Sequence, residues 1–459
     1  MKNNIIAFVL LLILCHSAFA NVTLPNVFSD NMVLQRNTEV SIWGWANPQE
    51  EVVVTPSWDH ETYKIKASNQ AKWEIKMPTP KEGGPYTISI KGYNEIVLTN
   101  ILIGEVWICS GQSNMEMSAS WGIENGDEAV KKAANPIIRF FSIPKLTATS
   151  PQNNVSGNWT ECTPATMKYF SASAYFFANR LQEELQNVPI GLISSSWGGT
   201  PAEIWMPEEI IQNDAVLLES AKTRKEESYG PNQAGRAFNA MIYPLVGFKI
   251  AGVIWYQGES NVGSAVYDKT FAALITSWRK LWNYEFPFYY VQIAPYQYGE
   301  NHFGGAEIRN AQRKVLKVIR NTGMVVTTDI STIDDIHPKN KKSVGTRLAN
   351  LALVKTYKAN SDLVNGPLYK GIKIEKNKVI VAFDHAEGLH SKDEKSSQFE
   401  IAATDNVFYK ADARIKGNTV LLQSKKVKHP VKVRFSWKNT AQSDLFNKAN
   451  LPASSFITE

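Results

Sequence analysis

The sequence predicts a three-layer α/β/α domain with an antiparallel β-domain before it and a further β-region after it. Three observations predict this order: short alternating strands up to residue 100, a strand–helix–strand rhythm over residues 101–357, and short strands again over 358–459. Parallel sheets covered by helices produce such a rhythm. With 459 residues the chain is too long for one core, so several domains are expected.

The first twenty residues have the pattern of a secretory signal peptide. Lys2 supplies a positive charge, residues 5–14 are apolar, and Ala18-Phe19-Ala20 resembles a cleavage site. The apolar run is short for a membrane span. We therefore expect an exported, periplasmic or extracellular protein without a membrane anchor, whose mature chain begins near Asn21.

Residues 21–100 predict a small antiparallel, sandwich-like β-domain. Runs such as 39–45 and 86–90 alternate apolar and polar residues between Asn-Pro and Gly-Gly turns. Two interpretations of the tryptophans in this segment stay open. They form a platform that stacks on a sugar or, more commonly, they fill the core of a sandwich; the residues are Trp43, Trp45 and Trp73.

The middle segment supplies the strands and helices of the α/β domain. Strands are expected at 105–109, 137–141, 189–195, 252–256, 288–293 and 324–329. Amphipathic helices are expected at 174–185, 271–282 and 308–319. The last segment adds strands at 379–383, 419–422 and 431–435.

Charge and cysteine content exclude several classes of protein. The net charge of +6 is scattered, and no concentrated basic stripe predicts nucleic-acid binding. After export, Cys109 and Cys162 either pair or remain inert thiols. Neither a disulfide framework nor a zinc site of the cysteine type is indicated.

Four segments with polar, chemically useful residues follow predicted strands: 111–114, 194–200, 255–261 and 334–337. Because strands of a parallel sheet point the same way, these segments should gather at one edge. Ser113 lies on a turn after the strand at 105–109, where it could act as a nucleophile. A serine nucleophile needs a neighbouring base.

The α/β segment offers two histidines as that base, His302 and His337. His337 is expected to open an amphipathic helix and has carboxylates two and three residues before it, Asp335 and Asp334. A carboxylate can hold the imidazole with its other nitrogen toward the serine. His302 has no such neighbour directly before it, which favours a substrate contact or an exposed position.

The oxyanion of an acyl-transfer intermediate needs hydrogen-bond donors. Candidates are a backbone N–H at Gly198-Gly199, the Gln257 carboxamide and the Ser113 amide. A metal site at Asp334, Asp335 and His337 is the alternative chemistry, but no His-x-His or His-Glu-x-x-His pattern supports it. We expect no metal.

These blocks resemble the SGNH hydrolases and, within them, the sialate O-acetylesterase family. The resemblance rests on residues 111–115 (Gly-Gln-Ser-Asn-Met), 255–261 (Trp-Tyr-Gln-Gly-Glu-Ser-Asn) and 335–338 (Asp-Ile-His-Pro). Residues 41–46 and 451–454 are also similar to the family's N-terminal β-domain and usual ending. The resemblance covers nearly the whole mature chain.

The resemblance implies a flavodoxin-like catalytic domain, a serine esterase mechanism, no cofactor and an O-acetylated sugar as substrate. Carried onto this chain, it gives Ser113 as nucleophile, His337 as base and oxyanion donors at Ser113, Gly198 and Gln257. Gln257 stands where the superfamily has an asparagine, with Asn261 as the alternative. Asp334 matches the superfamily spacing Asp-x-x-His, and Asp335 is the alternative acid. Expected substrate contacts are Gln112, Asn114, Glu259, Asn261 and His302.

The function expected from the sequence is removal of O-acetyl groups from sialic acid or a related acetylated sugar. A deacetylase of xylan, other hemicellulose or pectin fragments, with the same machinery, is the nearer alternative. A non-catalytic sugar-binding protein is the remote one. The sequence gives no indication of oligomeric state.

Overall fold

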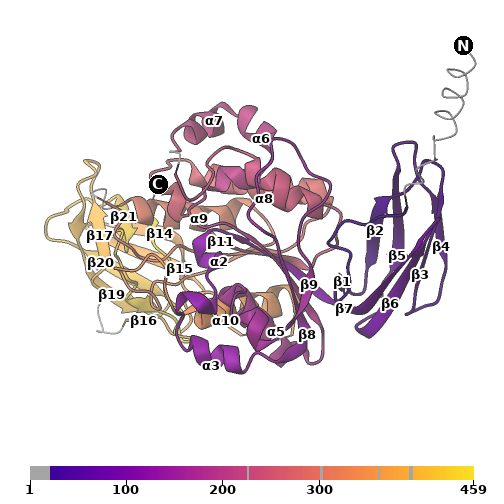
Figure 1. Ribbon diagram of the computed structural model, residues 1–459. Coiled ribbons are helices and arrows are strands. Elements are labelled where there is room, and N and C mark those ends of the chain that lie inside the picture. The colour runs from indigo at the N-terminus through magenta and orange to yellow at the C-terminus, as the bar shows by residue number, and fades with distance from the viewer. Residues whose placement is uncertain (1–20, 225–226, 300–302, 360–361, 392–395, 459) are drawn as a thin grey trace, which may run out of the picture.

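The computed structural model describes residues 21–224, 227–299, 303–359, 362–391 and 396–458. The expected signal peptide and His302 lie outside these residues. Figure 1 shows a central body of sheet and helices, with the N-terminal β-strands on one side and the C-terminal strands on the other. The fold class predicted from the sequence is therefore confirmed.

The N-terminal strands form the antiparallel domain that alternation predicts. The domain contains β1 (Val33–Gln35), β2 (Glu39–Trp45), β3 (Glu51–Pro56), β4 (Tyr63–Lys66), β5 (Lys72–Pro78) and β6 (Gly83–Lys91). β2 pairs with β5, and β3 pairs with β4 and β6. Every second residue of β5 is buried, as expected for strands with one face on a core.

One long strand, β7 (Glu95–Gly111), belongs to both the N-terminal domain and the central sheet. Its first half pairs antiparallel with β6, and its second half pairs in parallel with β10 (Ile190–Ser196) and β11 (Gly252–Tyr256). The boundary expected after residue 100 lies within this strand.

A buried polar network also connects the N-terminal domain to the central sheet. Glu105 accepts hydrogen bonds from the side chains of Gln35 (2.9 Å), Arg36 (2.6 Å) and Tyr357 (3.1 Å). Gln35 in turn accepts a bond from the backbone N–H of Val106 at 2.9 Å. The network connects the loop after β1, the middle of β7 and the end of the α/β domain.

The central sheet has the order β13–β12–β11–β7–β10–β8–β9. The remaining members are β8 (Asn135–Ser142), β9 (Trp159–Cys162), β12 (Phe288–Val291) and β13 (Thr322–Val325). All neighbours pair in parallel except β8 and β9, which are antiparallel. The carboxyl ends of the parallel strands therefore meet at one edge, where ligands of open α/β sheets bind.

Helices cover both faces of this sheet. The longer ones are α5 (Ala172–Leu185), α8 (Tyr267–Trp282), α9 (Gly304–Val318) and α10 (Lys341–Ala352). α5 packs against α10, and α8 against α9. In β7, Trp107 belongs to the apolar core with α5 and α10, whereas Ile108 belongs to the core with α8 and α9. Burial of alternate residues in two cores explains the near-continuous apolar sequence of this strand.

Shorter helical segments connect these elements. The short α-helices are α2 (Ser113–Glu116), α3 (Gly126–Lys131), α4 (Pro164–Met167), α6 (Glu208–Gln212) and α7 (Ala215–Lys222). The 3-10 and π segments are η1 (Ala119–Trp121), η2 (Ala202–Trp205), η3 (Phe238–Ile242), η4 (Tyr243–Leu245), η5 (Glu259–Asn261) and η6 (Leu353–Tyr357).

The C-terminal region is antiparallel and has an apolar core of its own. It contains β14 (Leu368–Glu375), β15 (Lys378–Asp384), β16 (His390–Ser391), β17 (Phe399–Ala402), β18 (Tyr409–Lys410), β19 (Asp412–Lys416), β20 (Thr419–Gln423), β21 (Lys432–Phe435), β22 (Leu445–Phe446) and β23 (Phe456–Ile457). Arg309 of α9 attaches the region, because its guanidinium donates to the carbonyl of Asn439 at 3.2 Å.

Cys109 and Cys162 are free and buried. Burial raises the pKa of the Cys109 thiol well above its usual range and that of Cys162 to about 12. Since the thiolate is the reactive form, both are inert thiols, one of the two states expected from the sequence.

Candidate active site

The nucleophile candidate, Ser113, is the first residue of α2 and lies two residues after the end of β7. At Gly111 the backbone has φ +135°, and an added Cβ would lie 2.2 Å from the Tyr256 carbonyl oxygen. Only glycine fits this close approach, which lets the chain leave the sheet and enter α2. Ser113 itself is 9% exposed. It is thus held at the carboxyl edge of the sheet, where the sequence places it.

Gln112, just before the serine, holds the third block in place. Its backbone N–H donates to the carbonyl of Tyr256 at 2.9 Å. Its side-chain oxygen accepts from the N–H of Ser260 at 3.2 Å. Gln112 was expected to contact substrate; in the structure its side chain is buried and links two loops of the site.

Asn114 connects three segments that are far apart in the sequence. Its amide nitrogen donates to Glu259 Oε1 at 2.7 Å and to the carbonyl of Ile336 at 2.9 Å. Its amide oxygen accepts from Lys341 Nζ at 2.6 Å. Since Asn114 follows the serine and Ile336 precedes His337, this side chain ties the nucleophile helix to the histidine loop.

The partners of Asn114 are a buried acid and a buried base. Burial raises the pKa of Glu259 and lowers that of Lys341 to about 7. The charge of Lys341 partly offsets the first shift, and that of Glu259 partly offsets the second. Charged groups are tolerated inside proteins when they are paired and hydrogen-bonded.

Lys341 was not anticipated from the sequence, although a signal was present. It lies three and seven residues before Val344 and Leu348, which are buried residues of α10. Residues at this spacing share one helix face. A lysine in the apolar stripe of a helix predicts a buried cation with a dedicated partner.

His337 is half-buried in the loop before α10. The helix begins only at Lys341, with Asn340 as its N-cap accepting from the N–H of Ser343 at 3.0 Å. The expectation that His337 opens the helix is therefore wrong, because the side chain of Asn340 and Pro338 set the start later. Burial lowers the pKa of His337, as does the charge of Lys341, while Asp335 and Glu116 raise it.

The two candidate acids lie in different surroundings. Asp335 is partly buried, and its Oδ1 accepts the backbone N–H of His337 at 2.8 Å. Its negative charge acts on the imidazole. Asp334 is exposed, and the charges that act on His337 come from Lys341, Asp335 and Glu116.

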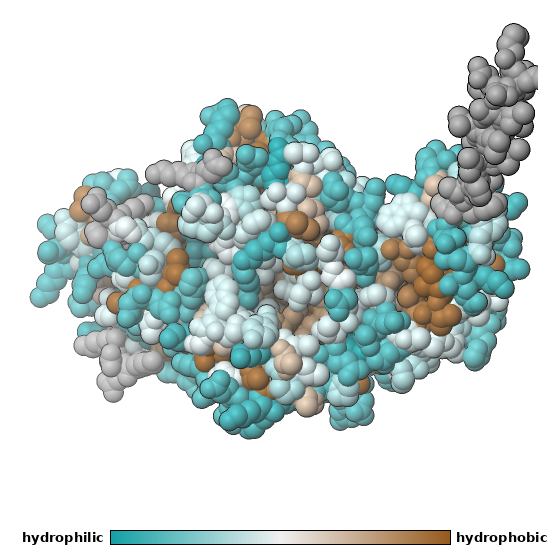
Figure 2. Space-filling model, in the orientation of Figure 1, coloured by the Kyte–Doolittle hydropathy of each residue, from teal (hydrophilic) through white to brown (hydrophobic). Residues whose placement is uncertain are grey.

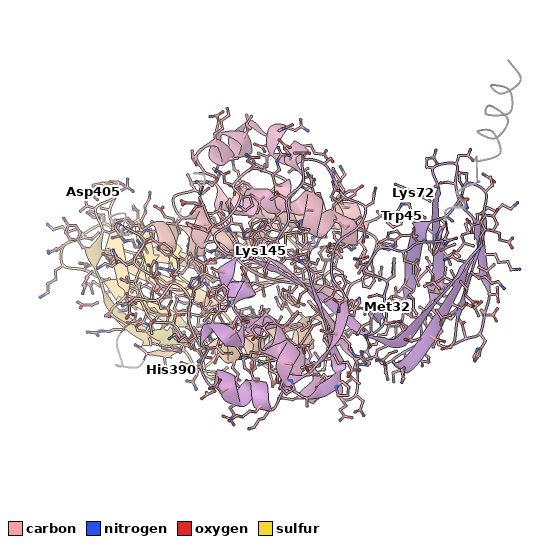
Figure 3. All side chains as sticks on the ribbon, viewed as in Figure 1. Met32, Trp45, Lys72, Lys145, His390 and Asp405 are labelled. Atoms are coloured by element: carbon pink, nitrogen blue, oxygen red, sulfur yellow. The ribbon has the colours of Figure 1, made fainter. Side chains whose placement is uncertain are left out.

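Gly198 lies against the serine. A Cβ added to it would be 3.2 Å from Ser113 Cβ and 3.2 Å from Glu116 Oε2. Its N–H donates to Glu116 Oε2 at 2.7 Å, and the other oxygen of Glu116 is 2.6 Å from Lys145 Nζ. Glu116 and Lys145 were not anticipated from the sequence, although Glu116 lies about one helical turn after Ser113. Figure 3 labels Lys145 in the central body.

Gln257 and Asn261, the two candidates for a further oxyanion donor, bind to each other. Gln257 Nε2 donates to Asn261 Oδ1 at 2.7 Å and to the carbonyl of Thr200 at 3.2 Å. The amide nitrogen of Asn261 donates to both carboxylate oxygens of Glu203, at 2.9 and 3.2 Å. Both amides thus support the loop after β10, and their N–H groups already donate to protein oxygens.

In the part of the chain that the structure describes, no group of three His, Cys, Asp or Glu side chains could hold a metal ion. Among the same residues, no helix is long and apolar enough to cross a membrane.

Residues 103–354 match the carbohydrate esterase family of sialic acid-specific acetylesterases. The chain is 30% identical to sialate O-acetylesterase of Rattus norvegicus, in an alignment that covers 82% of this chain and 81% of that protein. It is 29% identical to the Homo sapiens enzyme of that name, covering 82% and 78% of the two chains. A solved carbohydrate acetylesterase from Xanthomonas citri shares 34% identity and superposes with a TM-score of 0.86, covering 95% of this chain and 99% of that one.

The fold, the serine at the sheet edge and these similarities define the protein as a carbohydrate esterase. More particularly, the chain belongs to the sialic acid-specific acetylesterase family.

Proposed function

We propose that this esterase removes O-acetyl groups from sialic acid or a related acetylated sugar through an acetyl-enzyme on Ser113. One observation carries the mechanism: Asn114 binds the carbonyl of Ile336 at 2.9 Å and so holds the histidine loop beside the helix that begins with Ser113. Acyl transfer by serine requires that the nucleophile and the base be held in fixed positions relative to each other.

In the proposed reaction, Ser113 Oγ attacks the acetyl carbonyl carbon while His337 takes the hydroxyl proton. The C–O bond to the sugar then breaks, and the sugar oxygen leaves with the proton from His337. Water attacks the acetyl-serine, again giving a proton to His337. Acetic acid leaves and loses its proton to solvent, while the proton on His337 returns to Ser113, so that the enzyme is regenerated.

Asp335 is our choice for the acid that orients and stabilises His337, in place of Asp334. It is supported by the bond from the His337 N–H, by its partial burial and by its effect on the pKa of the imidazole. A carboxylate beside an imidazolium stabilises the charge that forms when the serine is deprotonated. Exposed Asp334 would exert a weaker, solvent-screened effect.

The backbone N–H groups of Ser113 and Gly198 are the proposed oxyanion donors. To reach Gly198, the acetyl oxygen must take the place of Glu116 Oε2. Lys145, which already pairs with the other oxygen of Glu116, then remains a partner for the displaced carboxylate. Gln257 serves as a brace of the Gly198–Thr200 loop in this proposal, through its bond to the Thr200 carbonyl.

Ser113→Ala tests the mechanism directly. Removing the nucleophile of such a site costs at least about 10³-fold in turnover, measured as release of p-nitrophenol from p-nitrophenyl acetate. Ser120→Ala, which changes a serine bonded to the neighbouring Ser118 side chain, serves as the matched control. Activity of the Ser113 variant close to that of the wild type, with unchanged circular dichroism, would exclude Ser113 as nucleophile.

The acetylated sugar is the finer part of the proposal. The rat and human relatives are named for sialate, whereas the Xanthomonas citri relative, with higher identity, is named only for carbohydrate. A hemicellulose acetylesterase is therefore the second candidate. Acetate release from O-acetylated sialic acids, acetylated xylan and acetylated pectin fragments separates them. Deacetylation of xylan with sialic acid esters untouched would reject the sialate assignment.

Export is also part of the proposal, and it rests on the signal-peptide pattern of the first twenty residues. N-terminal sequencing of the protein recovered from outside the cytoplasm should begin near Asn21.

A further inference from the structure

A second groove lies between the N-terminal β-domain and the central body, and we call it the junction groove. It has a volume of about 430 Å³, and its walls include Trp43, Trp45, Lys72 and Glu74 on one side and Gln152 and Tyr243 on the other. Ligand pockets in proteins are commonly of this size and lie at domain interfaces. Figure 3 labels Trp45 and Lys72 together on the edge of the β-domain beside the central body. Figure 2 shows the outline of the molecule indented between these two parts.

The pairing of β2 with β5 decides which tryptophans face the groove. Trp43 is opposite Glu74 and Trp45 is opposite Lys72, so these four side chains share one face of the two strands. Trp73 is opposite Gly44 on the other face and is 3% exposed. Trp73 is therefore mainly a core residue that only borders the groove, while Trp43 and Trp45 lie on the more exposed face of the strands.

Trp43 is packed against aromatic residues where the β-domain meets the central body. Its ring meets the edge of Phe28 with centroids 4.5 Å apart at 84°, and Phe28 in turn contacts Phe248 of the central body at 5.6 Å. Gly247 has φ +95°, and a Cβ there would be only 3.6 Å from the Trp43 ring. Glycine thus permits the turn that brings the central body against this indole.

The polar groups of the groove are balanced in charge. Ser41 donates to Glu74 Oε1 at 2.6 Å, which orients that carboxylate. Lys72 and Glu74 are exposed side chains of opposite sign, so the rim carries no net charge. A groove that was built for an acidic ligand would need an excess of positive charge.

We propose that the junction groove binds a segment of a neutral polysaccharide, independently of the catalytic site. The indoles of Trp43 and Trp45 are two residues apart on one strand, about 7 Å along it. They provide adjacent aromatic surfaces for the apolar faces of successive sugar rings, while the ends of Lys72 and Glu74 bind hydroxyl groups. Aromatic walls with a few placed polar groups are the usual composition of a ligand site.

Trp45→Ala tests the proposal in native gels that contain soluble xyloglucan, xylan or, as acidic probes, polygalacturonate and polysialic acid. The wild type should be retarded by at least one neutral polysaccharide, and Trp45→Ala should migrate as it does in a gel without polysaccharide. Trp58→Ala is the matched control, since Trp58 lies in the same domain, where it contacts Tyr86 and donates to the Pro78 carbonyl. This control should be retarded like the wild type.

Hydrolysis of p-nitrophenyl acetate distinguishes loss of binding from loss of folding. Trp45→Ala should keep this activity within about twofold, as expected for a surface substitution. If Trp45→Ala loses this activity, the double variant Lys72→Ala/Glu74→Ala is tested in the same gels instead. It should also lose retardation. Equal migration of the wild type with and without every neutral polysaccharide would overturn the proposal. So would retardation by the acidic probes alone, or full retardation of the groove variants.

Discussion

The serine end and the histidine end of the proposed dyad are held in different ways. Ser113 lies two residues after the central strand of the sheet, and both of its neighbours, Gln112 and Asn114, bind other loops through their side chains. His337 lies in a half-buried loop, which is fixed by the bond from Asn114 to Ile336 and by the Asp335 turn. The sheet therefore places the nucleophile, whereas a few side-chain hydrogen bonds place the base.

The largest expected effect on kcat at the histidine end comes from substitution of the aspartate that stabilises His337. Asp335→Asn is expected to lower kcat by about 10²–10⁴-fold, because an amide cannot stabilise the imidazolium as a carboxylate does. Asp334→Asn, the matched control at the preceding residue, should change kcat by less than about twofold. Both are measured with p-nitrophenyl acetate at saturating concentration. The reverse ranking would return the role to Asp334.

A smaller effect should come from the link between the two ends. Asn114→Ala leaves Glu259 Oε1 and Lys341 Nζ without a shared partner in the interior. The expected loss is about 2–4 kcal/mol of unfolding free energy, together with reduced kcat because the histidine loop is released. Thermal and urea denaturation measure the first, and p-nitrophenyl acetate hydrolysis the second.

Asn69→Ala is the control for this link, since Asn69 makes an exposed side-chain bond to Gln49. Its stability should match that of the wild type. Unchanged stability of Asn114→Ala would mean that the buried acid and base do not depend on this amide.

The smallest effect should appear in the pH dependence of kcat/KM. His337 must be neutral to act as base, and its pKa is lowered from 6.5 by burial, so activity should reach its plateau from an acid limb below pH 6.5. Glu116 raises this pKa. Glu116→Gln removes the negative charge and should move the limb to lower pH. The plateau should stay within about threefold, since the glutamine oxygen can still accept the N–H of Gly198. A limb that moved to higher pH would contradict the assignment of this limb to His337.

The sequence predicted the sheet and the position of Ser113 at its edge well, for a physical reason. In β7, residues 105–109 are buried on both faces, and a doubly buried strand must be apolar along its whole length. The glycine that ends it is required by the close approach to Tyr256. Both constraints act on residues of one short segment, so their result is visible in one stretch of sequence.

The partners of the site residues could not be predicted in this way. Asn114, Glu259 and Asn261 were expected to contact substrate, yet the structure shows their side chains bound to protein groups 58 to 227 positions away. The residue type shows that such a side chain needs a hydrogen bond, but the tertiary fold decides with which group. Spacing also could not separate the two aspartates, because their exposure depends on the tertiary fold: Asp334 is exposed and Asp335 is partly buried.

The long strand β7 also has a mechanical consequence. Both halves of β7 are bonded to neighbouring strands, so a change of angle between the N-terminal domain and the central sheet would have to bend a paired strand. The junction groove and Ser113 then keep a constant separation. A polymer that was held in the groove would present its acetyl groups to the serine at one set distance along the chain. Long glycans would then lose acetyl groups at a set distance from the bound segment, a preference that short acetylated oligosaccharides could not show.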